Sequence, residues 1–178
     1  NSMRAELGPD WPFGGWVEQH VNVFDERLEL TLSVTAADRP MPAMVGWHPW
    51  FRRRLLSEPS SSAELRFQPG RMVERDDAMV PTGHLIDPTP GPWDDCFTDV
   101  AQPLTLTWPG VIELRLTSSC DHWVIYDRPA HAICVEPQSG APDAFNQTPA
   151  VLAPGDSLTE TFTMSWRLLG ESSERERA

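Results

Sequence analysis

Two residues of the chain combine an ionisable side chain with a setting suited to proton transfer. His48 lies in the segment 46–51, which reads Gly-Trp-His-Pro-Trp-Phe, and Glu136 follows the apolar run 132–135. An imidazole and a carboxylate often act as general acid and general base, each worth about 10²–10⁴-fold in rate. An isolated histidine after a strand is more often structural, and a glutamate at a strand end is often simply solvated. Residue type and position alone do not separate a catalytic role for these two from the ordinary ones.

The strands that must position these side chains are indicated by alternation of apolar and polar residues. The alternation is clearest at 28–34, where Leu or Val occupies every second position. The same period of two recurs in three further segments: 104–108, 112–116 and 162–166. Short strands are also expected near 17–24, 63–67, 123–126 and 131–136.

Tight turns and prolines complete the predicted architecture. Residues 24–27 are expected to turn the first hairpin, and Pro109-Gly110 suits positions i+1 and i+2 of a type II turn. Eighteen prolines leave no room for a long helix, although a single helical turn is expected near 141–145. The fold class we expect is all-β, a large antiparallel β-sandwich with long connecting loops.

Composition excludes several classes of partner and cofactor. The net charge of −12 provides no basic patch for nucleic acid, and no apolar run is long enough to span a membrane. Cys96, Cys120 and Cys134 are odd in number and lack zinc-site spacing, which favours a reducing, cytoplasmic location. The chain has no glycine-rich phosphate loop and no histidines with metal-ligand spacing, so we expect neither a cofactor nor a metal.

Three segments, taken in order, carry a family resemblance. They are Gly-Trp-His-Pro-Trp-Phe at 46–51, Pro-Trp-Asp-Asp-Cys-Phe at 92–97, and Cys-Val-Glu-Pro-Gln at 134–138, followed by Pro-Asp-Ala-Phe-Asn at 142–146. Together they resemble the aldose 1-epimerase (galactose mutarotase-like) family, whose members carry His-Pro-aromatic-Phe, Asp-x-x-Phe and Glu-x-Gln…Pro-Asp-Ala-x-Asn segments. The last segment is the most specific. The resemblance implies the galactose mutarotase-like supersandwich fold.

The resemblance also implies a reaction and roles for three residues. It implies an isomerase that interconverts the α and β anomers of a hexose without a cofactor. Glu136 matches the catalytic base, His48 the catalytic acid, and Asp94 the residue that holds sugar hydroxyls. Removing a proton from the anomeric hydroxyl and delivering one to the ring oxygen opens the C1–O5 bond. The aldehyde then rotates about C1–C2, and the ring closes on its other face.

Further substrate contacts are expected from residues beside the motifs. Trp50 and Trp93 flank motif residues and could stack on a pyranose face, although most tryptophans of such a chain belong to its core. Asp95 is a weaker candidate than Asp94, because its position varies in the family and an Asp pair is by default a turn. Gln138 belongs to the Glu-x-Gln segment and is the remaining candidate.

The three arginines Arg52, Arg53 and Arg54 leave a second function open. Their ordinary interpretation is a solvated charge run, but a guanidinium is also a planar donor suited to phosphate. In that case the substrate would be a hexose 6-phosphate and the protein a hexose-6-phosphate 1-epimerase. A third alternative is a non-catalytic carbohydrate-binding protein that retains the sugar pocket without turnover.

The chain departs from the family in its length. Family members are usually longer, and their upstream half supplies an Arg and a His with no equivalent here. We therefore expect residues 1–169 to form one sandwich domain that is incomplete at its N-terminal side, followed by a polar tail at 170–178. The strands around 28–34 and 104–116 should then expose unpaired edges and an apolar face. A missing N-terminal half or a homo-oligomeric copy would cover them.

Overall fold

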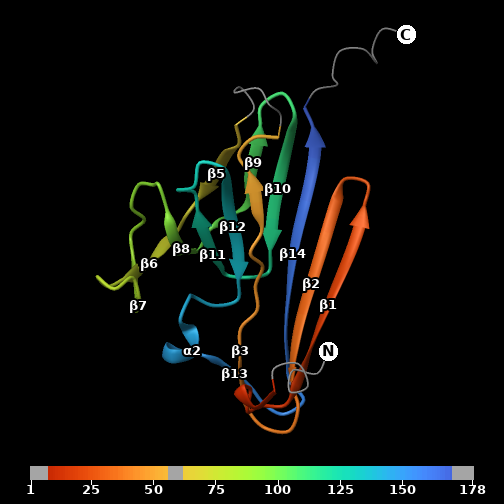
Figure 1. Cartoon of the computed structure of the whole chain (residues 1–178), viewed down its shortest axis with the longest axis vertical. Helices are drawn as coiled ribbons and strands as arrows, with labels where there is room; N and C mark the ends of the chain where they lie inside the picture. Colours follow the sequence, from red (N-terminus) through yellow and green to blue (C-terminus); the bar gives the residue numbers. More distant parts are fainter. Residues whose placement is uncertain (1–7, 56–61, 170–178) are drawn as a thin grey trace.

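A computed structural model describes residues 8–55 and 62–169 of the chain as two six-stranded sheets that face each other (Figure 1). Every strand pair is antiparallel. The expected all-β antiparallel sandwich is therefore confirmed. The polar tail expected at 170–178 lies outside the described residues. No helix in the described ranges is long and apolar enough to cross a membrane.

The two sheets draw their strands from distant parts of the sequence. The first sheet contains, in spatial order, β1 (Gly15–Phe24), β2 (Arg27–Ala36), β14 (Ser157–Leu168), β10 (Ile112–Ser118), β9 (Ala101–Trp108) and β5 (Glu64–Gln68). The second contains β4 (Trp50–Arg52), β12 (Ala132–Gln138), β11 (His122–Tyr126), β8 (Asp94–Thr98), β6 (Arg71–Arg75) and β7 (Pro81–Ile86). The remaining elements are the pair β3 (Met41–Ala43) and β13 (Ala150–Leu152), and the short helices η1 (Gly8–Asp10) and α2 (Ala144–Gln147).

Both predicted turns occur where the sequence placed them. Phe24 pairs with Arg27, so two residues close the β1–β2 hairpin. Gly110 has a φ of 72°, and the amide of Val111 donates to the carbonyl of Trp108 at 3.0 Å. These are features of a type II turn with glycine at i+2. The helical turn expected near 141–145 is displaced along the chain, since α2 spans Ala144–Gln147.

The main core lies between the sheets and is built by the alternation that predicted the strands. Leu104, Leu106 and Leu116 of the first sheet face Ile125 and Val135 of the second, and all five are fully buried. A second buried cluster lies at the end of β2, where the segment that contains β3 covers the sheet. It consists of Val34, Ala36, Met41, Ala43 and Val45. The second cluster anchors the chain segment that leads to His48.

Unpaired edges were expected at residues 104–116 and 28–34. The expectation is wrong for 104–116, and near 28–34 the edge is formed by the neighbouring strand β1. Strands β9 and β10 lie inside the first sheet, so residues 104–116 are paired on both sides. Strand β2 is also interior, and β1 stands at the end of the described sheet (Figure 1). On β1, Val21 and Val23 pair with Leu30 and Leu28 and remain 55% and 73% exposed. The open apolar surface therefore belongs to β1.

Candidate active site

The loop that carries His48 is tied to the end of β12 by backbone hydrogen bonds. The amide of Ser139 donates to the carbonyl of Val45 at 2.8 Å, and the amide of Val45 donates to Ser139 Oγ at 2.9 Å. The amide of Trp47 donates to the carbonyl of Pro137 at 3.0 Å. A Cβ at Gly46 would lie only 2.8 Å from that carbonyl oxygen, so the close approach requires glycine. This loop fixes His48 beside β12.

Alternation directs the two candidate catalytic side chains toward each other. The ring of Trp47 points into the sandwich and contacts Phe162 at a centroid distance of 5.8 Å, and the side chain of His48, the next residue, is 61% exposed. On β12, Val135 belongs to the core between the sheets, so Glu136 lies on the opposite, outer face. Glu136 is nevertheless only 3% exposed. The pair thus joins a buried carboxylate to an accessible imidazole.

Four side chains form one connected polar group at this position. His48 Nε2 lies 3.1 Å from Glu136 Oε1, and His48 Nδ1 lies 3.6 Å from the sulfur of Cys134. Gln138 Nε2 donates to Glu136 Oε2 at 3.4 Å. Both oxygens of the Glu136 carboxylate therefore have partners, and both nitrogens of the His48 ring have neighbours.

Burial shifts the pKa of two members of this group, Glu136 and Cys134. It raises the pKa of Glu136, an effect that nearby His48 opposes and the negative charge of Asp94 reinforces. Burial also raises the pKa of the Cys134 thiol to about 12, with a further contribution from Glu136. A carboxylate whose pKa is raised is a stronger base than an ordinary surface glutamate, which suits proton abstraction near neutral pH.

The two neighbouring aspartates play different parts. Asp94 pairs in register with Tyr126, which in turn pairs with Cys134, so Asp94 lies on the same outer face as Glu136. Its side chain is 43% exposed. Its carboxylate lies 3.9 Å from Nη1 of Arg128, which is about half exposed. Asp95 forms an ion pair with Arg75, and both of these side chains are largely buried. The structure thus brings Asp94 to the face of the candidate pair, whereas the carboxylate of Asp95 is engaged by Arg75.

The two candidate tryptophans, Trp50 and Trp93, lie in different parts of the structure. Trp50 lies opposite Cys134 on β4, and its exposed ring stacks against the rings of His48 and His131 at 5.8 and 6.0 Å. Trp93 lies among core aromatic rings, with edge contacts to Phe67 and Phe97. Trp50 therefore adjoins the candidate pair, and the structure places Trp93 away from it.

The arginine run alternates along β4 and just beyond it. Arg52 pairs with Ala132, which puts it on the same face as Glu136, and it is exposed. The Arg53 guanidinium donates through Nε to the carbonyl of Pro129 at 2.7 Å, and through Nη2 to that of Asp127. Arg54 is exposed beyond the end of the strand. Of the three, Arg52 is the one that the β4–β12 register places, exposed, on the Glu136 face.

Two pockets lie beside the candidate pair. One of about 390 Å³ is lined by His48, Gln138 and residues of the 44–47 loop. Another of about 210 Å³ is lined by Asp94, Asp95 and Val124, the residue opposite Glu136 in the β11–β12 register. Space for a ligand therefore exists beside His48 in one pocket and beside Asp94 in the other, and Glu136 itself lines neither.

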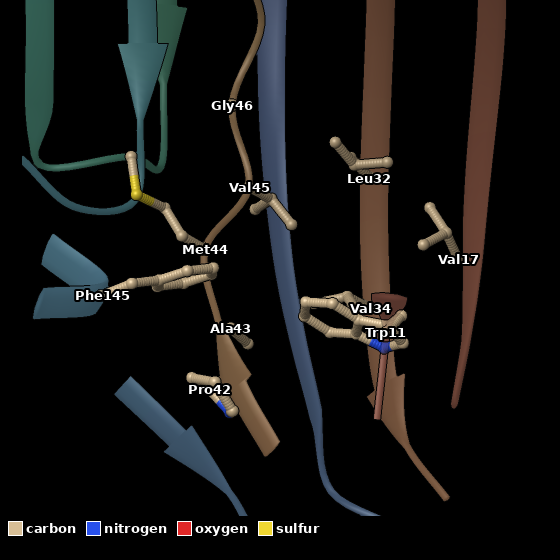
Figure 2. Close-up of a pocket in the computed structure, with 10 residues that line it drawn as sticks. All are labelled: Trp11, Val17, Leu32, Val34, Pro42, Ala43, Met44, Val45, Gly46 and Phe145. Atoms are coloured by element: carbon tan, nitrogen blue, oxygen red, sulfur yellow. The ribbon is translucent and has the colours of Figure 1, made fainter. Parts of the chain in front are cut away.

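An apolar groove adjoins the first pocket (Figure 2). It has a volume of about 280 Å³ and runs between the β1–β2 hairpin and the loop before His48. Val17, Leu32 and Val34 line one side, and Phe145 lies on the other side, next to the loop (Figure 2). Phe145 and loop residues 44–46 line both the groove and the His48 pocket. The pocket is thus continuous with an apolar surface that ends at β1.

Three residues near the site were not anticipated from the sequence. Cys134 touches His48, His131 stacks on Trp50, and Arg75 holds Asp95. Cys134 could have been found, because a period of two from Glu136 places it on the same face of β12. His131 and Arg75 have no such signal, since tertiary packing alone brings them to the site.

Fold and site together define an all-β sandwich protein with a contacting histidine and glutamate on the outer face of one sheet. Residues 2–165 match the model of the aldose 1-epimerase family, and the chain therefore belongs to that family. A search of curated protein sequences finds no significant match.

Solved structures show the same fold. The chain is similar to a galactose mutarotase-like protein from Clostridium acetobutylicum, with a TM-score of 0.77 and 15% identity. A galactose mutarotase-like protein from Lactobacillus casei gives 0.73 and 20%, and a galactose 1-epimerase from Lactobacillus acidophilus gives 0.69 and 14%. These matches cover 89%, 94% and 89% of this chain, but only 57%, 68% and 58% of the solved chains. The chain thus spans roughly three fifths of two of these relatives and slightly over two thirds of the third.

Proposed function

We propose that the chain carries the acid–base centre of an aldose 1-epimerase, which interconverts the α and β anomers of a hexose in carbohydrate metabolism. The observation that carries this proposal is the 3.1 Å contact between the accessible imidazole of His48 and the buried carboxylate of Glu136. Family membership supports it, because the pair occurs in a chain that matches the aldose 1-epimerase model. The three cysteines are free and buried, which supports a cytoplasmic location.

In the proposed reaction Glu136 removes the proton of the anomeric hydroxyl. Protonated His48 donates its proton to the ring oxygen as the C1–O5 bond breaks, which leaves an open-chain aldehyde and neutral His48. Rotation about C1–C2 presents the other face of the carbonyl carbon. The O5 hydroxyl then attacks C1 and gives its proton to His48. Glu136 returns its proton to the new anomeric oxygen. In the free protein the two groups contact each other, so the sugar must enter between them.

The surroundings of the pair supply the remaining roles. Gln138 orients the Glu136 carboxylate through its amide, and the burial that raises the pKa of Glu136 makes the carboxylate a better base. Asp94 is proposed to bind sugar hydroxyls and Trp50 to contact the pyranose, because both lie on the face of Glu136. Asp95 is proposed to act indirectly, by fixing Arg75 and the start of β8.

A hexose 6-phosphate is a second candidate substrate, and Arg52 is the observation that favours it. Arg52 is exposed on the Glu136 face, two residues from Trp50, where its guanidinium could meet a phosphate. The Arg53 guanidinium is already bonded to two backbone carbonyls, so it contributes less to this candidate. A third alternative is a carbohydrate-binding protein that binds the sugar without converting it. Only a measurement of epimerase activity distinguishes it from the two enzymes.

Polarimetry with freshly dissolved α-anomers tests the proposal. We expect the protein to accelerate relaxation of α-glucose or α-galactose, and Glu136→Gln to abolish most of the acceleration. Glu18→Gln, on exposed β1, serves as the matched control and should remain active. Free hexoses and hexose 6-phosphates are compared on this chain and on a polypeptide extended to the length of the relatives. Saturable sugar binding without acceleration in either form would select the binding protein.

A further inference from the structure

Three residues of the site, His48, Cys134 and Glu136, offer metal-ligand atoms, and one of them, Cys134, has no role in the proposed proton transfer. One ligand atom each from His48, Cys134 and Glu136 lies within 4.8 Å of the other two. A tetrahedral Zn²⁺ binds sulfur at about 2.3 Å and nitrogen or oxygen at about 2.0–2.2 Å, which puts its ligand atoms roughly 3.3–3.7 Å apart. The contacts of His48 have similar lengths but use different ring nitrogens, Nε2 at 3.1 Å to Glu136 and Nδ1 at 3.6 Å to Cys134, so the ring must turn to offer one nitrogen to a shared ion.

The donors differ in exposure, with one accessible side chain beside two buried ones. Cys134 and Glu136 stand two residues apart on β12, which fixes them on one face of a central strand of the sheet. The His48 side chain is 61% exposed, so its ring has room to turn one nitrogen toward both partners. Of the three donors only His48 lines the pocket of about 390 Å³, and Cys134 and Glu136 are almost fully buried, so an ion must enter from the side of His48.

Charge and ligand chemistry favour a particular class of ion. Asp94 acts electrostatically on Glu136, and the net charge of −12 of the whole chain favours association with cations over anions. A thiolate, an imidazole and a carboxylate together are typical of Zn²⁺ rather than of Mg²⁺ or Ca²⁺, which prefer oxygen ligands.

We infer that His48, Cys134 and Glu136 bind a thiophilic divalent cation such as Zn²⁺, with solvent in the fourth position. Binding releases the proton of the Cys134 thiol to solvent and forms one Zn–S bond. Under the proposed function the ion also occupies both groups of the acid–base pair, so the ion and the sugar exclude each other. The site would thus make the enzyme sensitive to inhibition by free zinc.

Metal binding is measured without any sugar, by competition of the purified chain with a chromophoric zinc chelator and by Co²⁺ absorption. We expect one ion per chain and a thiolate-to-cobalt charge-transfer band in the near ultraviolet. Cys134→Ser should abolish the band and most of the zinc affinity. The matched control is Cys96→Ser, which removes a buried thiol from the same face of the same sheet and should change neither.

A second variant keeps the inference testable if Cys134→Ser does not fold. His48→Ala removes an exposed side chain and should weaken zinc binding by at least about tenfold. Absence of stoichiometric binding, or equal binding by the wild type and these variants, would overturn the inference. The outcome is independent of catalysis. Zinc binding without epimerase activity would support the metal site and reject the proposed function. Epimerase activity that zinc never inhibits would support the proposed function and reject the metal site.

Discussion

Replacing Glu136 by glutamine should make the protein a worse catalyst and a more stable fold. The amide keeps the size of the side chain and can still bond to Gln138, but it cannot accept the proton of the anomeric hydroxyl. Loss of a positioned base costs about 10²-fold or more in kcat, with a smaller effect on sugar binding. The mutarotation rate and a binding isotherm on the same preparation measure the two effects separately.

The gain in stability follows from burial of the carboxylate. Burial raises the pKa of Glu136 in the native state above its unfolded value near 4.5, despite the opposing effect of His48. The native state then binds the proton more tightly, so this contribution to stability is fully present below pH 4.5. It is lost as pH rises through the native pKa. Each unit of elevation is worth about 1.4 kcal/mol at neutral pH.

Glutamine carries no charge and avoids this loss. We therefore expect Glu136→Gln to unfold at a higher urea concentration than the wild type at pH 7, and the difference to shrink as the pH is lowered toward 4.5. The control Glu18→Gln lies on the exposed strand β1 and should show no such trend. A variant that is less stable than the wild type at pH 7 would show that the His48–Glu136 ion pair outweighs burial, and would refute the reasoning.

Three further substitutions test how the site is held and what it binds. Gly46→Ala should lower kcat with a milder effect on stability, because a Cβ would push the His48 loop away from β12; unchanged kinetics would contradict this. Asp95→Ala should lower the free energy of unfolding by about 1–3 kcal/mol, measured in urea, since it leaves Arg75 unpaired. If a phosphate is bound, Arg52→Ala should raise KM for a hexose 6-phosphate but not for the free hexose. Arg53→Ala should instead destabilise the fold, and equal effects on both substrates would remove the phosphate candidate.

The fold was predictable where a strand is long enough to show alternation. Strands β2, β9, β10 and β14 display it over most of their length, and their inward positions form the core. Strands β3, β4 and β13 have three residues each, too few to show a period. Strand β8 begins with two aspartates, which are uncommon in strands, so its sequence suggested a turn.

The motifs predicted candidate residues for the site but not how those residues contact each other. The family motif indicated His48 and Glu136, but their contact depends on hydrogen bonds between the 45–47 loop and the end of β12. Trp50 and Trp93 both flank motif residues, yet one adjoins the pair and the other lies with the core. Proximity to a motif in the sequence does not determine which face of a sheet a side chain takes.

The central claim is that the chain opens and closes a sugar ring with Glu136 and His48. Magnetisation transfer between the α and β anomeric proton signals of a hexose at equilibrium measures this interconversion directly. We predict transfer that increases with protein concentration, falls about 10²-fold or more in Glu136→Gln, and survives in Glu18→Gln. The measurement is made on this chain and on the polypeptide extended to the length of its relatives. Transfer no faster than in buffer for both, or equally fast in Glu136→Gln, would contradict the account.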